Sequence, residues 1–596
     1  MATTVKPVIY QLVVRYFGNT NTTNRRNGTL AVNGCGRFVD ISTAALDGLA
    51  GLGITHVWLT GCLRQATLTD YSTARMPADD PDVVKGIAGS MYAVRDYFDV
   101  CPDYATAPGL RMAEFEALVR RVHQADLKVI LDFVPNHVAR GYHSVVEPQL
   151  DFGLGDDQGK FFDRNNHFFY LPGTQLSLTH PPGWDPPGAL FDGRFAPEDG
   201  TPGRTPKVTG DNCASASPSV SNWYETVKLN YGFDFTTGTK DFTPRPRTWD
   251  LVDQILAYWQ AKGADGFRCD MAHYVPREAW EHLIAKAKGR DPGCLFLAEA
   301  YPGGGSDLPI SNLDDILAAG FTAYYHSDAY NALKRIYQGH GSQDDYDKTI
   351  TPLSAAGRAG RMGYLENHDE RRIASPVEPG RGEGDSGFGA AEAGYQLAPL
   401  QLLFGAGPVL FYNGQEVGEP GAGAEGFSSG DGRTTTFDYW CMPEFAKWVN
   451  GHVYDGGTSS QGQKDLRHYY ADLLALCQDP SVRGDGYWGL KYHNRASAFS
   501  ACPDDLYTFA RFQGGSGRLV LVVANFRPNA AVGGRVGIPE ALAAVVGLPP
   551  NVTVRLVLDR SGAKDVTISQ QSHQSLVEGG FPVSVPNQTA HVYVIA

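Results

Sequence analysis

The chain has 596 residues, which is long for one ordinary domain and suits a large domain with one or two smaller ones. Apolar residues make up 42% and charged residues 19%, a globular composition that excludes a disordered chain. The formal net charge of −14 disfavours a nucleic-acid partner and suits a neutral substrate.

Three further features indicate where the protein works. No charged segment followed by an apolar one opens the sequence, so we expect no signal peptide and a cytoplasmic protein. The longest apolar stretch, 397–412, is broken by Gly405-Ala406-Gly407-Pro408, so we expect no membrane span. Nine cysteines, an odd number without a CxxC pair, are typical of buried free thiols in a reducing compartment.

Eight apolar stretches separated by helical spacing predict an alternating β/α architecture. These stretches lie at 8–14, 54–59, from 129 onward, 266–272, 295–299, 321–325, 362–366 and 408–412. Between them, Ser42 can cap a first helix carrying Leu46 and Leu49, and helical spacing recurs over 112–122 and 249–259. The segment 60–109 is expected to be a long loop of functional length.

Two parts of the chain fall outside this alternation. Residues 138–245 lose all periodicity and are rich in Gly, Pro, Asn and Asp, which indicates an inserted subdomain after the third strand. Beyond about residue 485, short strands follow one another at 506–512, 519–523, 552–558 and 591–595. We therefore predict a (β/α)8 TIM barrel over 1–137 and 246–485, an inserted subdomain over 138–245, and a C-terminal all-β sandwich over 486–596.

Four of the predicted strands end in acidic or imidazole groups. Arg268 and Asp270 lie two residues apart, so their side chains share one face of a strand. The other strands end in Asn136-His137, in Glu299 and in His368-Asp369. An internal salt bridge would explain one such strand, but four of them indicate a site, because chemistry takes place at this end of a β/α barrel.

These four segments resemble, in order, the four short regions by which the α-amylase family, glycoside hydrolase family 13, is identified. The resemblance implies that Asp270 is the nucleophile, Glu299 the general acid/base and Asp369 a third carboxylate that binds sugar hydroxyls. Retention requires two carboxyl groups about 5–5.5 Å apart. We expect Arg268 to favour the ionised form of Asp270, and partial desolvation to raise the pKa of Glu299.

We predict five substrate-binding residues, namely Arg268 and four that resemble substrate contacts of that family. His137 and His368 match histidines that bind sugar hydroxyls, and Tyr92 matches a tyrosine that stacks on the reacting glucose. Arg372 resembles a substrate-contacting arginine found in part of the family. Each has a plainer interpretation, namely core histidines, a packing tyrosine, and a surface pair of Arg372 with Glu370.

The sequence also departs from many amylases at positions that hold calcium. Lys228, in Val227-Lys228-Leu229-Asn230, resembles the neopullulanase and cyclodextrinase branch and removes the usual calcium carboxylate. An asparagine-rich loop at 19–24 resembles another calcium loop, but Arg25 and Arg37 fall where its acids would be. Calcium prefers charged oxygen ligands. We therefore expect no required cofactor and no metal ligands; calcium is possible but not favoured.

Taken together, the sequence predicts a retaining hydrolase of α-1,4-glucosidic bonds in maltooligosaccharides or starch, with a covalent glycosyl–aspartate intermediate. A transglycosylase acting through the same residues is the close alternative. A non-catalytic sugar-binding or transport-accessory relative is disfavoured, because Asp270, Glu299 and Asp369 are all present. The sequence leaves the chain length of the substrate, α-1,4 versus α-1,6 selectivity and oligomeric state open.

Overall fold

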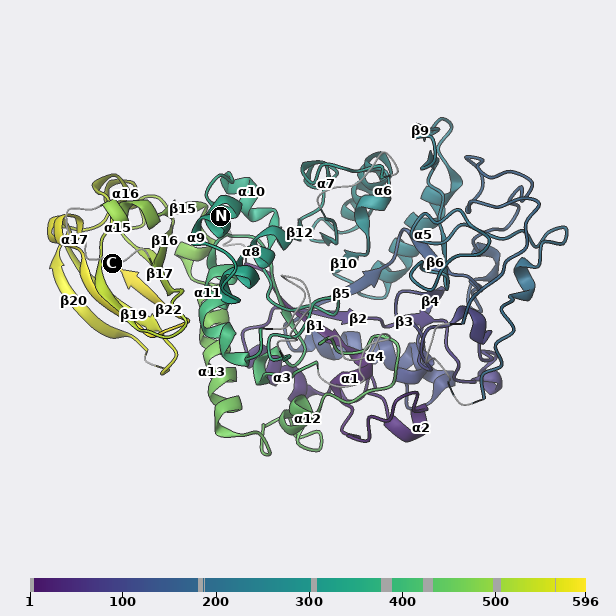
Figure 1. Ribbon diagram of the computed structural model, residues 1–596, viewed down its shortest axis with the longest axis horizontal. Helices are drawn as coiled ribbons and strands as arrows, with labels where there is room; N and C mark the ends of the chain where they lie inside the picture. The colour runs from purple at the N-terminus through teal and green to yellow at the C-terminus, as the bar shows by residue number, and fades with distance from the viewer. Residues whose placement is uncertain are drawn as a thin grey trace.

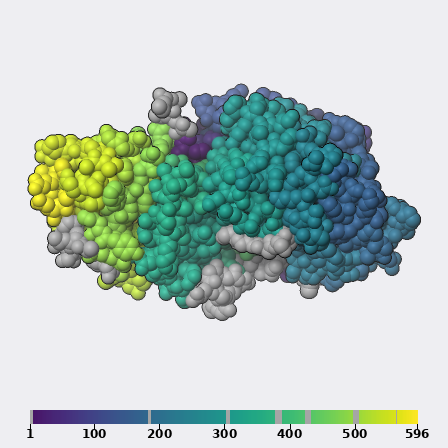
Figure 2. Space-filling view, turned by 90° about the horizontal axis from the view of Figure 1, so that it is seen from above, coloured from purple at the N-terminus to yellow at the C-terminus, as the bar shows by residue number. Residues whose placement is uncertain are grey.

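The computed structural model describes residues 5–180, 186, 188–301, 308–376, 388–421, 432–496, 505–562 and 564–596. Along the long axis of the molecule, the inserted segment lies at one end, the barrel in the middle and the C-terminal domain at the other end (Figure 1). The same C-terminal domain, in yellow, forms one end of the surface in Figure 2. Of the helices in the described ranges, none has the length and apolar character needed to cross a bilayer.

Eight parallel strands form the barrel, in the order β13-β12-β11-β10-β5-β2-β1-β14. They are β1 (Val8–Val13), β2 (His56–Thr60), β5 (Lys128–Phe133), β10 (Gly266–Cys269), β11 (Leu295–Ala298), β12 (Ala323–Tyr325), β13 (Arg361–Met362) and β14 (Val409–Tyr412). Gly363, just after β13, closes the ring by donating to the Pro408 carbonyl and accepting from Leu410 N, at 3.2 and 2.9 Å. The predicted barrel is thereby confirmed.

Three of the helices around the barrel, α3 (Thr43–Gly51), α4 (Arg111–Gln124) and α5 (Arg247–Ala261), coincide with the segments of predicted helical spacing. The other longer ones are α6 (Arg277–Arg290), α8 (Ser327–Tyr337), α9 (Gln343–Ile350), α11 (Gly394–Leu403) and α13 (Gln461–Leu476). Shorter ones are α1 (Val14–Phe17), α2 (Leu30–Asn33), α7 (Asp314–Ala318), α10 (Ala355–Ala359), α12 (Pro443–Val449) and α14 (Pro480–Arg483). The Ser42 side chain accepts a hydrogen bond from Ala45 N and so caps α3 as its sequence predicts.

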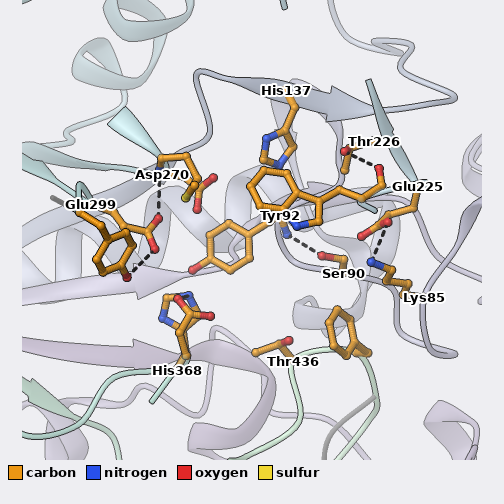
Figure 3. A pocket seen from close by; sticks show the side chains of 15 residues that line it. Lys85, Ser90, Tyr92, His137, Glu225, Thr226, Asp270, Glu299, His368 and Thr436 are labelled. Carbon is orange, nitrogen blue, oxygen red and sulfur yellow. Dashed lines mark hydrogen bonds and ion pairs between the residues drawn. The ribbon is translucent and has the colours of Figure 1, made fainter. Parts of the chain in front are cut away.

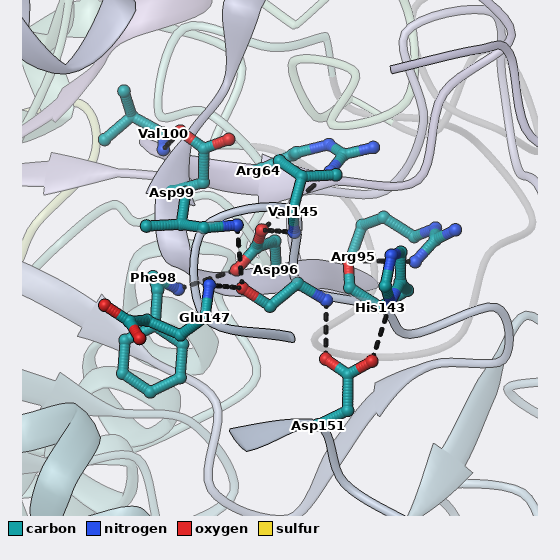
Figure 4. A network of polar contacts seen from close by, with 12 residues as sticks. Arg64, Arg95, Asp96, Phe98, Asp99, Val100, His143, Val145, Glu147 and Asp151 are labelled. Carbon is teal, nitrogen blue, oxygen red and sulfur yellow. Dashed lines mark hydrogen bonds and ion pairs between the residues drawn. The ribbon is translucent and has the colours of Figure 1, made fainter. Parts of the chain in front are cut away.

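The segment 60–109 is more ordered than the long loop expected from its sequence. It contains an antiparallel pair, β3 (Leu63–Gln65) with β4 (Val94–Val100). Asp96 on β4 accepts hydrogen bonds from Phe98 N and Val145 N, at 2.9 and 2.8 Å, as Figure 4 shows. A buried carboxylate on β4 thus fixes the place where the inserted segment leaves the barrel. The pattern missed this pair because β3 is short and the pairing has register shifts.

In the described part of the segment 138–245, the regular elements are short strands and two 3-10 turns, Pro148–Leu150 and Ala196–Glu198. β6 (His137–Ala139) pairs with β7 (Thr226–Lys228), and β8 (Phe233–Asp234) pairs with β9 (Thr239–Lys240). The β6–β7 pair brings the end of the segment back beside its start, next to the barrel strands.

The C-terminal region has a six-stranded antiparallel sheet and a two-stranded one. The large sheet contains β15 (Gly486–Gly489), β16 (Leu506–Phe512), β17 (Leu519–Asn525), β22 (Thr589–Ile595), β19 (Asn551–Leu558) and β20 (Val566–Ser572), and the small one β18 (Val532–Val536) and β21 (Phe581–Val585). The predicted β domain is confirmed, with three short helices in addition, α15 (Lys491–Ala496), α16 (Glu540–Val546) and α17 (His573–Gly579). Six or seven residues are too few for helical periodicity to show.

The two faces of the large sheet serve different cores. On β17, Val520 and Val522 belong to the same apolar cluster as the barrel, whereas Leu519 and Leu521 belong to a second cluster within the C-terminal domain. Strand alternation produces this division. Phe509 on β16 is fully buried in the barrel-side cluster and stacks on Tyr487, with ring centroids 5.5 Å apart.

We predict that Phe509→Ala lowers the free energy of unfolding by about 3–5 kcal/mol, because a buried ring would leave a cavity between two domains. Denaturant titration followed by circular dichroism measures this change. Val545→Ala, at a side chain that is half exposed, is the control and should stay within about 0.5 kcal/mol of the wild type. Equal stability of the two variants would contradict a shared core.

Candidate active site

The guanidinium of Arg268, near the end of β10, lies at the centre of the site. It has no exposed surface. Its Nη1 lies 2.9 Å from Asp270 Oδ1 and 3.2 Å from Asp132 Oδ1, and its Nη2 lies 2.9 Å from Glu299 Oε2. One buried cation therefore holds three carboxylates that come from three neighbouring barrel strands.

Asp270 and Glu299 lie directly beyond residues that are paired in the barrel. Cys269 on β10 is the partner of Ala298 on β11, and Glu299 N donates to the Cys269 carbonyl at 2.9 Å. The backbones of Asp270 and Glu299 are consequently one strand spacing apart, about 4.8 Å. Both side chains are almost fully buried at the wall of a pocket.

The turn after β10 positions Glu299. Met271 has a left-handed backbone with φ of 42°, an uncommon conformation for a residue other than glycine. This turn directs Met271 N to Glu299 Oε2 at 3.0 Å, while the Tyr301 hydroxyl donates to Glu299 Oε1 at 3.0 Å (Figure 3). Both oxygens of Glu299 thus have a fixed donor.

The protonation of the carboxylates follows from burial and from their number. Burial and the nearby Glu299 raise the pKa of Asp270 well above its usual value, and Arg268 opposes this. Burial likewise raises the pKa of Asp132 to about 6. Arg268 lowers the pKa of Asp270, as expected, but burial and the nearby Glu299 outweigh it, because one cation is shared among three acids.

His368 and Asp369 form the opposite side of the pocket. Gln11 Nε2 on β1 lies 2.8 Å from His368 Nδ1, and His368 Nε2 lies 3.1 Å from Asp369 Oδ2. Burial lowers the pKa of His368 to about 3, so the ring is neutral. With Gln11 donating to Nδ1, the ring proton is on Nε2 and faces Asp369. The Tyr92 ring stacks on His368 with centroids 5.0 Å apart.

His137 completes the set of polar groups at this end of the barrel. Asn136 Nδ2 lies 3.1 Å from His137 Nδ1, and burial lowers the pKa of His137 to about 3. The Trp223 ring lies 5.2 Å from the imidazole. Both histidines of the site are thus neutral hydrogen-bonding groups at physiological pH.

These side chains surround a pocket of about 310 Å³ (Figure 3). Of the residues predicted from the sequence, its lining contains Tyr92, His137, Asp270, Glu299, His368 and Asp369, and Arg268 lies behind the wall. The lining residues that the sequence did not identify are Lys85, Ser90, Trp223, Glu225, Thr226, Met271, Tyr301, Thr436 and Phe437. Most of them come from long connections, where side-chain periodicity gives no signal. Trp223 and Glu225 could have been sought just before the Val227-Lys228 segment.

Arg372 was predicted to contact the substrate, but it does not line the pocket. It is fully buried, with Nε 3.1 Å from Glu366 Oε2, Nη2 donating to the Asn413 carbonyl at 2.9 Å, and its guanidinium over the Tyr412 ring at 4.3 Å. The surface pair with Glu370 does not describe it either. Because these contacts occupy the guanidinium inside the barrel, Arg372 acts as a structural residue.

The residues expected around calcium make other contacts. Lys228 Nζ donates to Asn136 Oδ1 at 2.8 Å, so a buried ammonium occupies the amide oxygen that a metal would need. In the asparagine-rich loop, Asn24 Oδ1 accepts from Cys441 N at 2.8 Å, and Asn33 Oδ1 accepts from Arg25 N at 2.9 Å. These groups do not fit a calcium ion, which prefers several charged oxygens.

Comparison with known proteins identifies the domain that carries this site. The family model of the α-amylase catalytic domain matches residues 15–289. "Alpha-amylase MalA" of Haloarcula japonica is 25% identical over 385 residues, 64% of this chain and 42% of the relative. "Neopullulanase 2" of Thermoactinomyces vulgaris is 21% identical over 430 residues, 70% of this chain and 57% of the relative. The chain thus spans less than two thirds of either.

The fold has solved counterparts of similar length. The structure of the maltogenic α-amylase AmyB from Thermotoga neapolitana superposes with a TM-score of 0.57 at 16% identity, and covers 99% of this chain and 98% of that one. At this identity, the likeness shows a shared fold only. Residues 15–289 thus match the α-amylase catalytic domain, and the barrel that contains them has the fold of a solved α-amylase.

Proposed function

We propose that this protein is a retaining glycosidase that cleaves α-1,4-glucosidic bonds of maltooligosaccharides or starch through a glycosyl–Asp270 intermediate. The observation that carries the proposal is the placement of Asp270 and Glu299 on neighbouring strands with Arg268 between them. A backbone spacing of about one strand supports two carboxyl groups close enough for direct attack, as a retaining mechanism requires.

In the first step Glu299 acts as a general acid and Asp270 as a nucleophile. The carboxyl group of Glu299 donates a proton to the glycosidic oxygen while an oxygen of Asp270 attacks the anomeric carbon, so the bond to the leaving sugar breaks as the ester bond forms. In the second step Glu299 takes a proton from water, whose oxygen attacks the anomeric carbon and releases Asp270. Tyr301 and Met271 N hold Glu299 for both transfers.

The remaining polar groups suit a neutral, hydroxyl-rich substrate. His137 and His368 are neutral, so each offers a hydrogen bond without introducing a charge. The carboxylate of Asp369 is about half exposed, with a side-chain exposure of 49%, and can accept from sugar hydroxyls. Tyr92 presents a ring at the base of the pocket for the apolar face of a pyranose.

Transfer to a sugar instead of water is the second candidate. Trp223 and Tyr274 are half-buried, with ring centroids 6.3 Å apart, and offer an aromatic surface beside the pocket where an acceptor sugar could stack. A purely sugar-binding role is disfavoured by the complete set of three carboxylates.

We predict that Glu299→Gln and Asp270→Asn each lower kcat on maltooligosaccharides by about 10²–10⁴-fold or more, since each removes a group that makes or breaks a bond. Product analysis with matched melting curves measures this loss. Glu278→Gln, the same change at an exposed ion pair with Lys240, should leave the rate unchanged. Near-wild-type turnover by either site variant would refute the role assigned to that residue.

The stereochemistry of the product gives an independent test. Two successive inversions at the anomeric carbon should release the α-anomer first, which then mutarotates. Proton NMR in the first minutes of hydrolysis distinguishes the two anomers. An initial β-anomer would mean inversion, which needs carboxyls about 6.5–9.5 Å apart, and would exclude Asp270 as the nucleophile.

We also propose that activity does not depend on calcium, because the Lys228 ammonium already binds Asn136. Dialysis against EDTA should leave both the rate on short maltooligosaccharides and the melting temperature unchanged. Addition of calcium to the dialysed protein should not raise either value. Loss of activity that calcium restores would disprove the proposal.

A further inference from the structure

A buried ion pair lies at the end of the pocket opposite the general acid. Lys85 Nζ is 2.9 Å from Glu225 Oε2, and the two side chains are only 9% and 5% exposed. Lys85 comes from the connection between β3 and β4, and Glu225 immediately precedes β7. Figure 3 shows both on the far side of Tyr92 from Glu299. The pair therefore joins the barrel to the inserted segment at the pocket wall.

The proposed roles of Glu299 and Asp270 determine which end of a bound substrate faces this ion pair. The leaving sugar must lie beside Glu299, which protonates the oxygen between the two sugars. The reacting ring then lies over Tyr92, between Asp270 and His368. Its non-reducing end, where a longer chain would continue, points toward Lys85 and Glu225.

Packed apolar residues lie behind the ion pair. Tyr224, next to Glu225, is buried in a cluster of apolar side chains within and beside the inserted segment. This cluster consists of Val83, Leu176, Leu178, Phe195 and Tyr224. Lys85 Nζ also lies 5.0 Å from the centre of the Tyr224 ring. The ion pair is thus backed by a packed apolar cluster through the Tyr224 ring.

A tight backbone contact lies next to Lys85 in the chain. Gly86 has φ of +75°, and a Cβ at this position would lie 1.9 Å from the Phe437 carbonyl oxygen. The missing side chain lets the segment after Lys85 pack directly on the loop that contributes Thr436 and Phe437 to the pocket. Three segments far apart in sequence thus meet at this end.

Stability alone is a poor reason for a charged pair in this position. Removing two charges from water is costly, and apolar side chains of similar volume often serve a core as well. At the end of a sugar pocket, however, the pair offers donors and acceptors to the hydroxyls of a terminal sugar. It also presents a rigid wall to anything attached to that sugar.

We propose that Lys85 and Glu225 form the end wall of a blind pocket, so that the protein acts on the non-reducing ends of α-glucans and does not cleave internally. The inference rests on the proposed glycosidase function and deepens it by naming the part of the substrate that enters. The pair determines specificity and takes no part in bond breaking.

The test compares maltoheptaose with maltoheptaose whose non-reducing end carries a 4,6-ethylidene acetal. We expect the wild-type protein to cleave the blocked substrate at least about 100-fold more slowly, because the added group meets the wall. Equal rates on the two substrates would overturn the end wall and leave the glycosidase function intact. Failure to cleave either substrate would instead overturn the function on which the inference rests.

Variants locate the effect at this ion pair. The double variant Lys85→Ala/Glu225→Ala should raise the ratio of blocked to free cleavage at least about tenfold, because it opens the wall. Lys207→Ala removes another lysine paired with a buried glutamate, Glu198 at 3.0 Å, and should leave the ratio unchanged. Melting curves show that each variant is folded. An unchanged ratio in a folded double variant, or the same change in the control, would overturn the role of the pair.

Discussion

The structure of the site depends on one buried guanidinium. Arg268 has no contact with solvent, and its two terminal nitrogens are divided among Asp132, Asp270 and Glu299. A lone cation in the barrel would be strongly destabilising, and so would three unpaired carboxylates. Each group is stable there because the others are present. The arrangement that stabilises the barrel therefore also holds two carboxyl groups, Asp270 and Glu299, side by side.

The strand ends could be predicted from the sequence because their signal is local. Arg268, Asp270 and Glu299 follow apolar runs, and a parallel barrel brings the ends of such runs together. Residues 366–371, directly before Arg372, are all polar and gave no comparable guide to where its side chain points. Whether a side chain beyond a strand turns into the pocket or into the core depends on the turn itself. The side chain of Arg372 turns into the core because it contacts Glu366 and Asn413 there. Asn413 lies 41 residues away in the sequence, so this contact leaves no local signal.

The rest of the pocket could not be predicted, for a related physical reason. Lys85, Trp223 and Phe437 lie in irregular segments whose conformations are fixed by packing against one another. Sequence periodicity gives no signal of that packing. A glycine such as Gly86 is recognisable as a contact point only once the structure shows Phe437 beside it. Likewise, the raised pKa of Asp132 follows from burial, which depends on the whole barrel.

The shared core between the barrel and the C-terminal sheet has a consequence for how the chain can be divided. All ten residues of α11 are buried, as expected of a helix covered on every side, and residues of β17 and β22 complete its surroundings. A fragment ending before the sheet would leave an apolar helix facing water. The C-terminal domain therefore cannot be exchanged for another domain without changing the barrel. Grafting another domain onto this barrel would first require a new, polar outer face for α11.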